Sequence, residues 1–498
     1  MRGAWRVADV RATEESVMAG LPPHTLMRRA AEGLARRCVQ LLGRVYGRRV
    51  LLLVGGGNNG GDALFAGASL AGRGVAVRAA LLSPEKVHAA GLAALLAAGG
   101  RVADLGESTS DGADLVIDGI VGIGATGPLR GTAAEAVRAL SAMQPRPIVV
   151  AVDVPSGVDV DTGAVPGPAV RADVTVTFGL LKPAHVVGQG AQLSGLVDLV
   201  DIGLSTPDMQ PLAWVPDWED VAAWWPVPEP DSDKYTRGVA GVATGSPDYP
   251  GAALLSAAGA LAGPAGMVRY AGPVAADIVR AHPSVVTSQD VASAGRVQAW
   301  LVGCGIGTGD RALGEVVGVL STDLPAVVDA DGLTLAATPT VQRVLAERTA
   351  PTVVTPHDRE YERLAGVPVG PDRIASARSL AGRLGVTVLL KGDRTVVATP
   401  DGAVTVNPTG IAALATAGTG DVLAGLVVSL LAGGLAPERA ALAAAYVHGL
   451  AARHALQKGE NGGTPSAERT GQRGGRPVTA PDVAAALPTV IGSLLQAY

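Results

Sequence analysis

Aromatic side chains and cysteines are scarce in this chain of 498 residues. Aromatic residues make up 3% of the sequence, and the two cysteines, Cys38 and Cys304, lie far apart in it. Two cysteines in different halves predict no disulfide and are too few for a cysteine-based metal site. Small residues dominate instead, because 67 glycines and abundant alanine accompany an apolar content of 48%. This composition favours close packing of helices on sheets, with short loops.

An excess of basic residues and a long hydrophobic run are also missing. The formal net charge is −5, so the composition does not favour a nucleic acid or an anionic membrane as a partner. The longest apolar helical pattern, 422–435, contains glycines and falls well short of the ~20 residues of a membrane span. The N-terminal segment carries Asp9, Glu14 and Glu15 and lacks the apolar stretch of a signal peptide. We expect a cytoplasmic protein with small-molecule partners, and we also expect a homo-oligomer.

Strand-like apolar runs alternate with longer helical patterns in both halves of the chain. These runs lie near residues 50–55, 75–82, 115–121, 148–153, 174–179 and 197–200, and then near 239–244, 266–271, 299–303, 326–329, 352–355, 386–390, 395–399 and 403–406. The alternation predicts an α/β fold with parallel sheets covered on both faces. A segment without periodicity, Ser205–Pro211, separates the halves. Because the chain is too long for one core, we predict two domains, 1–210 and 211–498.

The run Ala417–Gly425 carries the clearest chemical signal. Gly418 and Gly420 leave backbone N–H groups uncovered where an apolar helical pattern begins, which is a favourable place for an anion. Asp421 follows in the first helical turn and could act as a base beside the bound anion. The alternative is a tight turn in which Asp421 only complements the helix dipole.

Most of the other polar or glycine-rich turns follow apolar strand patterns, where ligands bind in open α/β sheets. They include Lys234–Gly238, Gly245–Ala252, Gly303–Gly307, Asp329–Gly332, Thr355–Glu360 and Lys391–Thr395. In this order, and together with the Asp421 turn, these motifs resemble the ADP-dependent NAD(P)H-hydrate dehydratases of the ribokinase-like superfamily. The resemblance covers about residues 214–498.

Three further motifs lie in the N-terminal half. A buried-strand pattern runs into Gly55–Asp62, a second ends at Asp118 before Gly122–Pro128, and a third delivers Asp153–Asp159. Together they resemble the NAD(P)H-hydrate epimerase domain, over about residues 1–205. Both halves in one chain therefore resemble the bifunctional NAD(P)H-hydrate repair enzymes of bacteria, with a Rossmann-like three-layer domain followed by a ribokinase-like domain.

For the C-terminal half, the resemblance implies dehydration of the S epimer of hydrated NAD(P)H, coupled to conversion of ADP to AMP. Asp421 would then be the catalytic base. The residues implied for the hydrated nucleotide are Ala252, Gly305, Gly307, His357 and Asp421, and those for ADP or AMP are Lys391, Gly392, Asp393, Arg394, Thr395 and Gly420. We expect a magnesium ion with ADP, held by the phosphates or by Asp329 or Asp331. For His357, the alternative is a strand-end histidine bonded to the backbone.

For the N-terminal half, the resemblance implies interconversion of the R and S epimers, with Asp153 as the proton-transfer residue. The residues implied for the substrate are Asn58, Asn59, Gly60, Gly61, Asp62, Gly122, Ile123, Gly124, Ala125, Thr126, Gly127, Pro128 and Asp153. Asn59, Asp118 and Ser156 are implied to bind a potassium ion, and oxygen ligands of low total charge suit such a cation. A structural turn at Asp153 is the alternative role for that residue.

Two other functions are compatible with these motifs. The Asp421 turn could serve a ribokinase-like kinase that phosphorylates a small alcohol, and the N-terminal half could be a ligand-sensing module. The intact Asn58–Asn59 loop, with Asp153 and Ser156, argues against a purely sensing role. One departure from the family pattern is Ile411, which stands where a polar Asn is usual and cannot donate a hydrogen bond from its side chain.

Overall fold

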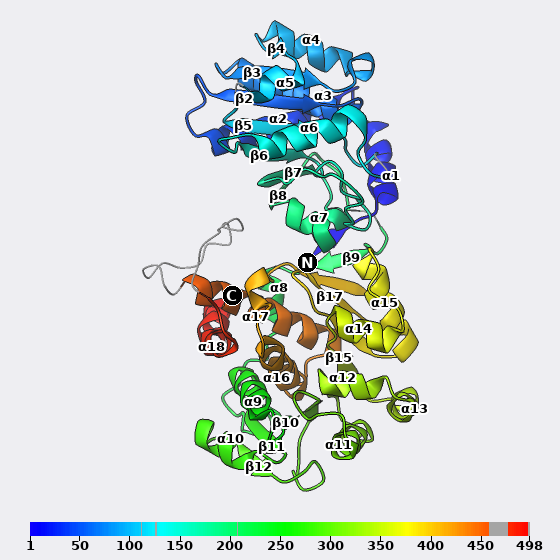
Figure 1. Cartoon of the computed structure of the whole chain (residues 1–498), viewed down its shortest axis with the longest axis vertical. Coiled ribbons are helices and arrows are strands. Elements are labelled where there is room, and N and C mark those ends of the chain that lie inside the picture. The colour runs from blue at the N-terminus through cyan, green and yellow to red at the C-terminus, as the bar shows by residue number, and fades with distance from the viewer. Residues whose placement is uncertain (111, 125–126, 207, 458–476, 497–498) are drawn as a thin grey trace. The chain divides into compact units, whose positions relative to one another are not determined.

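The computed structural model describes the whole chain except residues 111, 125–126, 207, 458–476 and 497–498. The chain forms two compact units. Residues 3–213 make the first unit, and residues 1–2 with the described residues from 214 onward make the second. Each unit contains one sheet with helices packed against it (Figure 1).

The first unit is built on a seven-stranded parallel sheet in the order β4-β3-β2-β5-β6-β7-β8. Its strands are β2 (Arg49–Val54), β3 (Ala76–Leu81), β4 (Arg101–Val102), β5 (Leu115–Gly119), β6 (Ile148–Val152), β7 (Val174–Phe178) and β8 (Leu196–Val200), and β1 (Arg2–Ala4) precedes them. Its helices are α1 (Val7–Met18), α2 (Thr25–Leu42), α3 (Asn58–Ala71), α4 (Ala89–Ala97), α5 (Leu105–Ser110), α6 (Gly131–Ala142) and α7 (Gly188–Leu193). The strand order reverses between β2 and β5, a position where α/β sheets bind ligands.

Both faces of this sheet are buried, as the continuous apolar strands predict. Val50, Leu52 and Val54 of β2 belong to a core cluster shared with α2 and α3. Leu51 and Leu53, which point to the opposite face, belong to a second cluster shared with α6. Side chains alternate between the faces of a strand, so an apolar residue is needed at every position.

The second unit carries a larger sheet, in which the strands run in the order β1-β9-β18-β17-β16-β15-β14-β13-β10-β11-β12. Its strands are β9 (Ala213–Val215), β10 (Val239–Ala243), β11 (Met267–Ala271), β12 (Val286–Ser288), β13 (Ala299–Val302), β14 (Ala326–Val328), β15 (Thr352–Val354), β16 (Thr387–Leu390), β17 (Thr395–Ala398) and β18 (Val404–Asn407). Its helices are α8 (Trp218–Trp224), α9 (Pro250–Ala262), α10 (Ala275–Ala281), α11 (Asp310–Leu320), α12 (Asp331–Ala336), α13 (Pro339–Glu347), α14 (Asp358–Ala365), α15 (Arg373–Leu384), α16 (Thr419–Ala432), α17 (Pro437–Gln457) and α18 (Ala480–Gln496).

Two features of the sheets differ from the sequence prediction. The pairs β16–β17 and β17–β18 are antiparallel, because short turns join these strands and leave no room for a crossover helix. The short strands β1, β4, β9 and β12, of two or three residues each, were not predicted from the apolar pattern. The remaining predicted strands lie within two residues of their observed positions.

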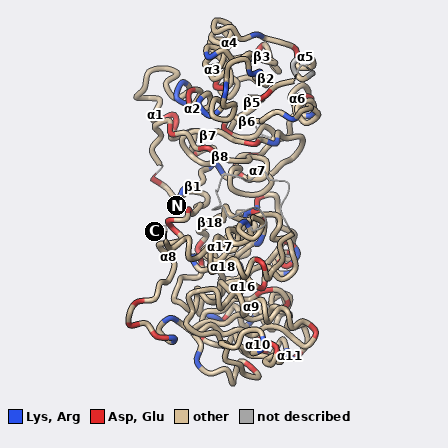
Figure 2. The backbone as a smooth tube through the Cα atoms, turned by 90° about the vertical axis from the view of Figure 1, so that its left-hand side faces the viewer, with Lys and Arg blue, Asp and Glu red and all other residues tan. Residues whose placement is uncertain are grey.

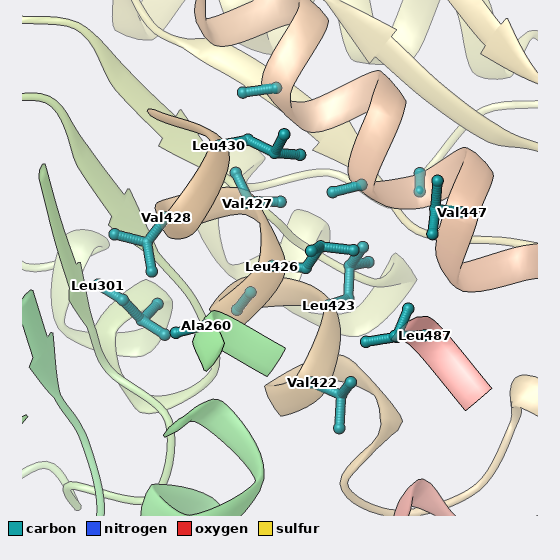
Figure 3. Close-up of a cluster of buried hydrophobic side chains, with 14 of the residues drawn as sticks. Ala260, Leu301, Val422, Leu423, Leu426, Val427, Val428, Leu430, Val447 and Leu487 are labelled. Carbon is teal, nitrogen blue, oxygen red and sulfur yellow. The ribbon is translucent and has the colours of Figure 1, made fainter. Parts of the chain in front are cut away.

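Helix α16 forms the centre of the second unit. Every residue from Val422 to Ala432 is buried. Figure 3 shows its valines and leucines surrounded by side chains from other elements, among them Ala260 of α9, Leu301 of β13 and Leu487 of α18. A helix that is apolar all round is stable only inside a core. The packing therefore fixes the position of its N-terminus, where Asp421 lies.

Acidic and basic residues are distributed over both units of the chain. In the view of Figure 2, basic and acidic residues are interspersed along the described backbone of both units. A nucleic-acid-binding face would require basic residues gathered on one side. Within the described residues, we find no helix with the length and apolar character needed to cross a bilayer.

Candidate active sites

In the second unit, the carboxyl ends of the parallel strands bring five of the six predicted turns to one edge of the sheet, whereas Lys234–Gly238 lies at the amino end of β10. The Gly245 amide, after β10, donates to the carbonyl of Cys304, after β13, at 2.7 Å. The Lys391 amide, after β16, donates to the carbonyl of Pro356, after β15, at 2.8 Å. These bonds link turns that are far apart in the sequence. The edge is the usual ligand position of an open parallel sheet.

The N-terminus of α16 opens at this edge. Gly418 precedes the helix with a φ of 87°, and a Cβ there would lie 2.4 Å from Leu255 Cδ1, so only glycine fits without strain. A Cβ on Gly420 would lie 3.6 Å from Lys391 Nζ, so the lysine head group is next to the helix N-terminus. Backbone N–H groups and an ammonium group together can hold a phosphate.

A buried ion-pair network surrounds Lys391. Its Nζ lies 2.8 Å from Asp329 Oδ1 and 3.5 Å from Glu360 Oε2. Burial alone would lower the pKa of Lys391, but the two carboxylates outweigh it and raise the pKa above its usual value. Lys391 therefore stays charged and fixed in place. Asp329 was a secondary candidate from the sequence, for magnesium, whereas Glu360 was given no role there. The pairing of both residues with Lys391 could not be read from spacing.

Asp421 combines burial with nearby negative charge. Burial and Asp329 raise the pKa of Asp421 to about 7, while the Cys304 thiol and Lys391 act in the opposite direction. A carboxyl group with a pKa near neutrality is suited to accept and release a proton. The Cys304 thiol donates to Asp329 Oδ2 at 3.6 Å, and burial together with Asp329 raises the pKa of this thiol. Cys304 is thus a protonated neighbour of the carboxylates.

His357 caps helix α14 and lies beside the Lys391 network. Its Nδ1 accepts from the amides of Arg359 and Glu360 at 3.1 and 3.3 Å, while the His357 amide donates to Glu360 Oε2 at 2.8 Å. Its side chain is 49% exposed, and its Nε2 lies 3.5 Å from Glu360 Oε1. The backbone-bonded alternative is therefore observed, and the exposed part of the ring faces solvent.

The other positions predicted for the hydrated nucleotide lie along the same strand ends. Gly305 has a φ of 64°, and a Cβ there would lie 2.7 Å from Ala252 Cβ, so these two residues are in close contact. The Gly307 amide donates to Asp331 Oδ2 at 2.9 Å.

The predicted nucleotide segment, 391–395, comprises the short loop between β16 and β17 and the first residue of β17. Thr395 Oγ1 donates to the carbonyl of Gly392 at 3.2 Å, and Arg394 donates to the carbonyl of Pro408. The side chain of Ile411 packs against the core cluster around α16. An apolar residue is accommodated there by burial rather than by hydrogen bonding.

In the first unit, a cavity of about 950 Å³ lies at the carboxyl ends of β2, β5 and β6. The predicted substrate residues that line it are Asn58, Asn59, Asp62, Gly122, Ile123, Gly124 and Asp153. Gly60 and Gly61 are buried on α3 but do not line the cavity. A Cβ on Gly60 would lie 2.3 Å from the carbonyl of Gly55, and a Cβ on Gly61 would lie 3.0 Å from the ring of His88. Gly127 and Pro128 are exposed and do not line the cavity. Ala125 and Thr126 lie outside the described residues.

Asp153 is held by residues that the sequence analysis did not identify. Its Oδ1 accepts from Lys182 Nζ at 2.6 Å and from Thr177 Oγ1 at 2.8 Å. The Lys182 side chain is 1% exposed. Burial alone would raise the pKa of Asp153, but Lys182 outweighs it and holds the pKa below its usual value. Lys182 follows strand β7, and nothing in that part of the sequence marks it as the partner of Asp153. The ion pair depends on the pairing of β6 with β7, which brings the two residues together.

The residues implied for potassium form a second cluster at the ends of β5 and β6. Ser156 Oγ donates to Asp118 Oδ1 at 2.7 Å, and the Ser156 amide donates to Asp118 Oδ2 at 2.8 Å. Asn59 Nδ2 donates to the carbonyl of Val121 at 2.9 Å, and the Val121 amide donates to Ser156 Oγ at 3.1 Å. Burial raises the pKa of Asp118 to about 6 against these hydrogen bonds. All the possible donor atoms are oxygens, and they include a single carboxylate group. This low total charge fits a monovalent cation better than a divalent one.

Family comparisons match both units of the chain. A family model described as NAD(P)H-hydrate dehydratase matches residues 240–469, and one described as YjeF-related protein N-terminus matches residues 23–184. The bifunctional NAD(P)H-hydrate repair enzyme Nnr of Mycobacterium tuberculosis (strain ATCC 25618 / H37Rv) is 50% identical over 445 residues, or 89% of this chain and 91% of that protein.

Two solved structures are also similar. An ADP/ATP-dependent NAD(P)H-hydrate dehydratase from Bacillus subtilis, co-crystallised with ATP/Mg²⁺, is 30% identical with a TM-score of 0.49, over 57% of this chain and 99% of that chain. A ribokinase-like superfamily protein from Enterococcus faecalis V583 is 22% identical with a TM-score of 0.50, over 59% of this chain and 100% of that chain. The second likeness shows a shared ribokinase-like fold.

Proposed function

This chain belongs to the family of bifunctional NAD(P)H-hydrate repair enzymes, and we propose that it repairs hydrated NAD(P)H in two steps. The N-terminal domain, 1–210, interconverts the R and S epimers, and the C-terminal domain, 211–498, dehydrates the S epimer with ADP, giving NAD(P)H, AMP and phosphate. The observation that carries the dehydratase assignment is the position of Asp421, a carboxyl with a pKa of about 7, beside the α16 N-terminus and Lys391.

The dehydration has a physical rationale in this geometry. Hydroxide is a poor leaving group, whereas phosphate is a good one. We propose that Asp421 accepts the proton of the ring hydroxyl. The hydroxyl oxygen then attacks the β-phosphorus of ADP, and the bond between this phosphorus and the oxygen of AMP breaks. The amides at Gly418–Gly420 and the Lys391 ammonium stabilise the charge on the phosphoryl group. Elimination then breaks the C–O bond to release phosphate, the neighbouring ring carbon loses a proton to water, and the new double bond gives NAD(P)H.

The ligand positions follow from the same edge of the sheet. We propose that Ala252, Gly305, Gly307, His357 and Asp421 contact the hydrated nucleotide, and that Lys391, Gly392, Asp393, Arg394, Thr395 and Gly420 contact ADP or AMP. Magnesium would be held by the phosphate oxygens with Asp329 or Asp331, where it neutralises phosphate charge. Cys304, Asp329 and Asp421 each place a possible ligand atom within 4.8 Å of the others. The carboxylates fit magnesium, whereas the protonated thiol does not.

For the epimerase, we propose that the cavity in the first unit binds the hydrated ring. The predicted substrate residues that line it would bind the substrate, namely Asn58, Asn59, Asp62, Gly122, Ile123, Gly124 and Asp153. Asn59, Asp118 and Ser156, helped by the carbonyl of Val121, would hold potassium, which supplies positive charge at the β5 and β6 ends. Asp153 lines this cavity and lies beside the bound ring.

One assay tests the proposed function. The purified chain is incubated with a mixture of R- and S-NADHX, with and without ADP, and the return of NADH absorbance is followed. We expect complete recovery with ADP, and epimer exchange alone without it. A phosphomonoester formed from ATP and an unrelated alcohol, with no effect on NADHX, would favour the small-molecule kinase instead. Light scattering on the same sample would test the expected homo-oligomer.

A further inference from the structure

The cavity of the first unit contains two buried aspartates whose surroundings are opposite. Asp153 and Asp62 both line it, and both are less than 10% exposed. Asp153 has a cationic partner and a hydroxyl donor, as described above. For Asp62, no group in the described part of the chain donates a hydrogen bond to Oδ1, although that atom is buried. An unpaired buried carboxylate is costly, whereas a neutral carboxyl is much less so.

In the Asp153–Lys182 pair, every proton on the lysine ammonium group is engaged in a hydrogen bond. Lys182 Nζ donates to Asp153 Oδ1 at 2.6 Å, to Thr177 Oγ1 at 2.9 Å and to the carbonyl of Phe178 at 3.2 Å, which uses all three of its N–H bonds. His185 Nδ1 accepts from the Lys182 amide at 3.1 Å, so its Nε2 carries the proton and donates to the carbonyl of Asp153 at 2.7 Å. Burial and Lys182 lower the pKa of His185 to about 4, so the ring stays neutral. This arrangement keeps Asp153 a carboxylate.

Asp62 has the opposite bias. Burial, the charge of Asp153 and the charge of Glu14 all raise the pKa of Asp62 well above its usual value. Glu14 comes from α1, Asp153 follows β6, and Asp62 lies in the second turn of α3, so three elements bring these carboxyls to one cavity. Two carboxyl groups whose pKa values are shifted in opposite directions can take different roles in one reaction.

We propose that Asp62 is the catalytic acid of the epimerisation and that Asp153, fixed by Lys182, is the permanent anion beside it. The proposal rests on the epimerase function proposed above, and it assigns to Asp62 the proton that the sequence analysis gave to Asp153. Lys182 is a positioning residue, because it acts through Asp153.

The proposed epimerisation removes water from the ring carbon and adds it back. Asp62 gives its proton to the ring hydroxyl, the C–O bond breaks with its electron pair leaving on water, and the lone pair of the ring nitrogen forms a C=N bond. The resulting cation is stabilised by the Asp153 carboxylate. Water then adds to either face of the ring carbon and returns a proton to Asp62, which gives both epimers without net consumption of acid.

The charged groups that face Asp62 determine the pH dependence. Apart from Asp153 and Glu14, the titratable residues lining the cavity are Arg11, Glu15 and His24, and the ring of His88 lies against α3 next to Gly61. Because the neutral form of Asp62 is the active one, epimerisation should fall as pH rises through the pKa of Asp62. Removing the Glu14 charge should lower that pKa, so this alkaline decline should move to lower pH.

Full-length variants test the proposal. Asp62→Asn keeps the shape of the side chain but cannot donate the proton, and we expect kcat for epimerisation to fall ~10²–10⁴-fold with a much smaller change in KM. Asp104→Asn, at an exposed position of the same unit, is the matched control and should leave both activities unchanged. Far-UV circular dichroism and urea unfolding of every variant report that the chain remains folded, and dehydration of pure S-NADHX reports that the second unit is intact.

The second measurement is the epimerisation pH profile of Glu14→Gln. A shift of its alkaline decline to lower pH supports the proposal even if Asp62→Asn misfolds. Near-normal kcat in a folded Asp62→Asn variant, or an unshifted decline in Glu14→Gln, overturns it. If the unmodified chain does not exchange the epimers at all, the proposed epimerase function fails, and the two failures are thereby distinguished.

Discussion

At the residue scale, the aspartates of this chain differ because their neighbours differ. Asp421 has carboxylates and a thiol around it, so burial and repulsion raise its pKa to about 7. Asp153 has a buried lysine within 2.6 Å, which keeps it charged. Asp118 accepts three hydrogen bonds, two of them from Ser156. The same side chain can therefore serve as a base, a fixed anion or a cation ligand.

The first prediction concerns the role of Asp421 as the base. Asp421→Asn should keep the fold and nucleotide binding, because the amide is isosteric, but dehydration of S-NADHX should fall ~10²–10⁴-fold. Epimerisation in the same protein is the internal control and should be unchanged. Near-normal NADH production by the variant would contradict the assignment.

The second prediction is the pH dependence of the same step. A base must be deprotonated to act, so dehydration at saturating S-NADHX and ADP should rise as pH increases through about 7, the pKa of Asp421. Below that pH the carboxyl is protonated and the rate should fall about tenfold per pH unit. The measurement is the initial rate of NADH formation between pH 5.5 and 8.5 at constant ionic strength. A flat profile would show that Asp421 does not limit the reaction.

At this scale the sequence indicated the candidate residues more readily than their hydrogen-bond and ion-pair partners. Asp421, Lys391 and Asp153 were identified as candidates because glycine turns and strand ends mark them. Their partners were harder to identify, because Lys182 and Glu360 meet them only through the pairing of strands. Spacing along the chain carries no information about which buried carboxyl has a cation beside it, and that neighbour decides its protonation.

At the element scale, helices α9 and α16 approach each other through glycines. A Cβ on Gly425 of α16 would lie 2.1 Å from the carbonyl of Ser256, and one on Gly259 of α9 would lie 2.1 Å from the carbonyl of Val422. The buried α16 was predicted as an apolar helix, but its contact with α9 depends on two glycines that the sequence alone does not pair. Since α16 carries Asp421 at its start, this packing also positions the proposed base.

The third prediction follows from that close approach. Gly425→Ala should destabilise the second unit by about 1–3 kcal/mol through overpacking and should lower dehydration by displacing α16. Gly318→Ala, in the exposed part of α11 where a Cβ meets nothing within 4 Å, is the matched control. It should be neutral or stabilising by up to ~1 kcal/mol. Urea unfolding of both variants gives the comparison, and equal midpoints would argue against the packing role.

The fourth prediction concerns the oxygen cluster at the ends of β5 and β6. Asp118→Ala removes its only carboxylate, so epimerisation should become slow and insensitive to potassium, while S-NADHX dehydration should be unaffected. The unmodified chain should lose epimerisation when potassium is replaced by tetramethylammonium, which is too large for the cluster. Full epimerisation by the unmodified chain in potassium-free buffer would show that the cluster serves only to fix Ser156.

At the scale of the whole molecule, each unit contains the described residues proposed for its own reaction. The cavity residues from Arg11 to Ile202 all belong to the first unit, and the Asp421–Lys391 network belongs to the second. Each sheet also has its own core clusters. Two folds, each with a ligand edge at its strand ends, were predictable from strand and helix alternation. The antiparallel hairpin β17–β18 was not, because a short apolar run does not reveal the direction of its neighbour.

The last prediction is that the two reactions proceed independently and are linked only by diffusion of the S epimer. A full-length Asp421→Asn chain should supply S-NADHX from R-NADHX, and a full-length Asp118→Ala chain should consume it with ADP. Each variant alone should fail to repair pure R-NADHX, apart from slow spontaneous exchange, which a protein-free sample measures. Mixed together they should restore NADH formation, with a lag that shortens as the Asp421→Asn chain is increased, because the intermediate must leave one protein and enter the other. No recovery on mixing, although each variant keeps its own remaining activity, would mean that the steps must occur within one chain, and the independent-enzyme interpretation would then be wrong.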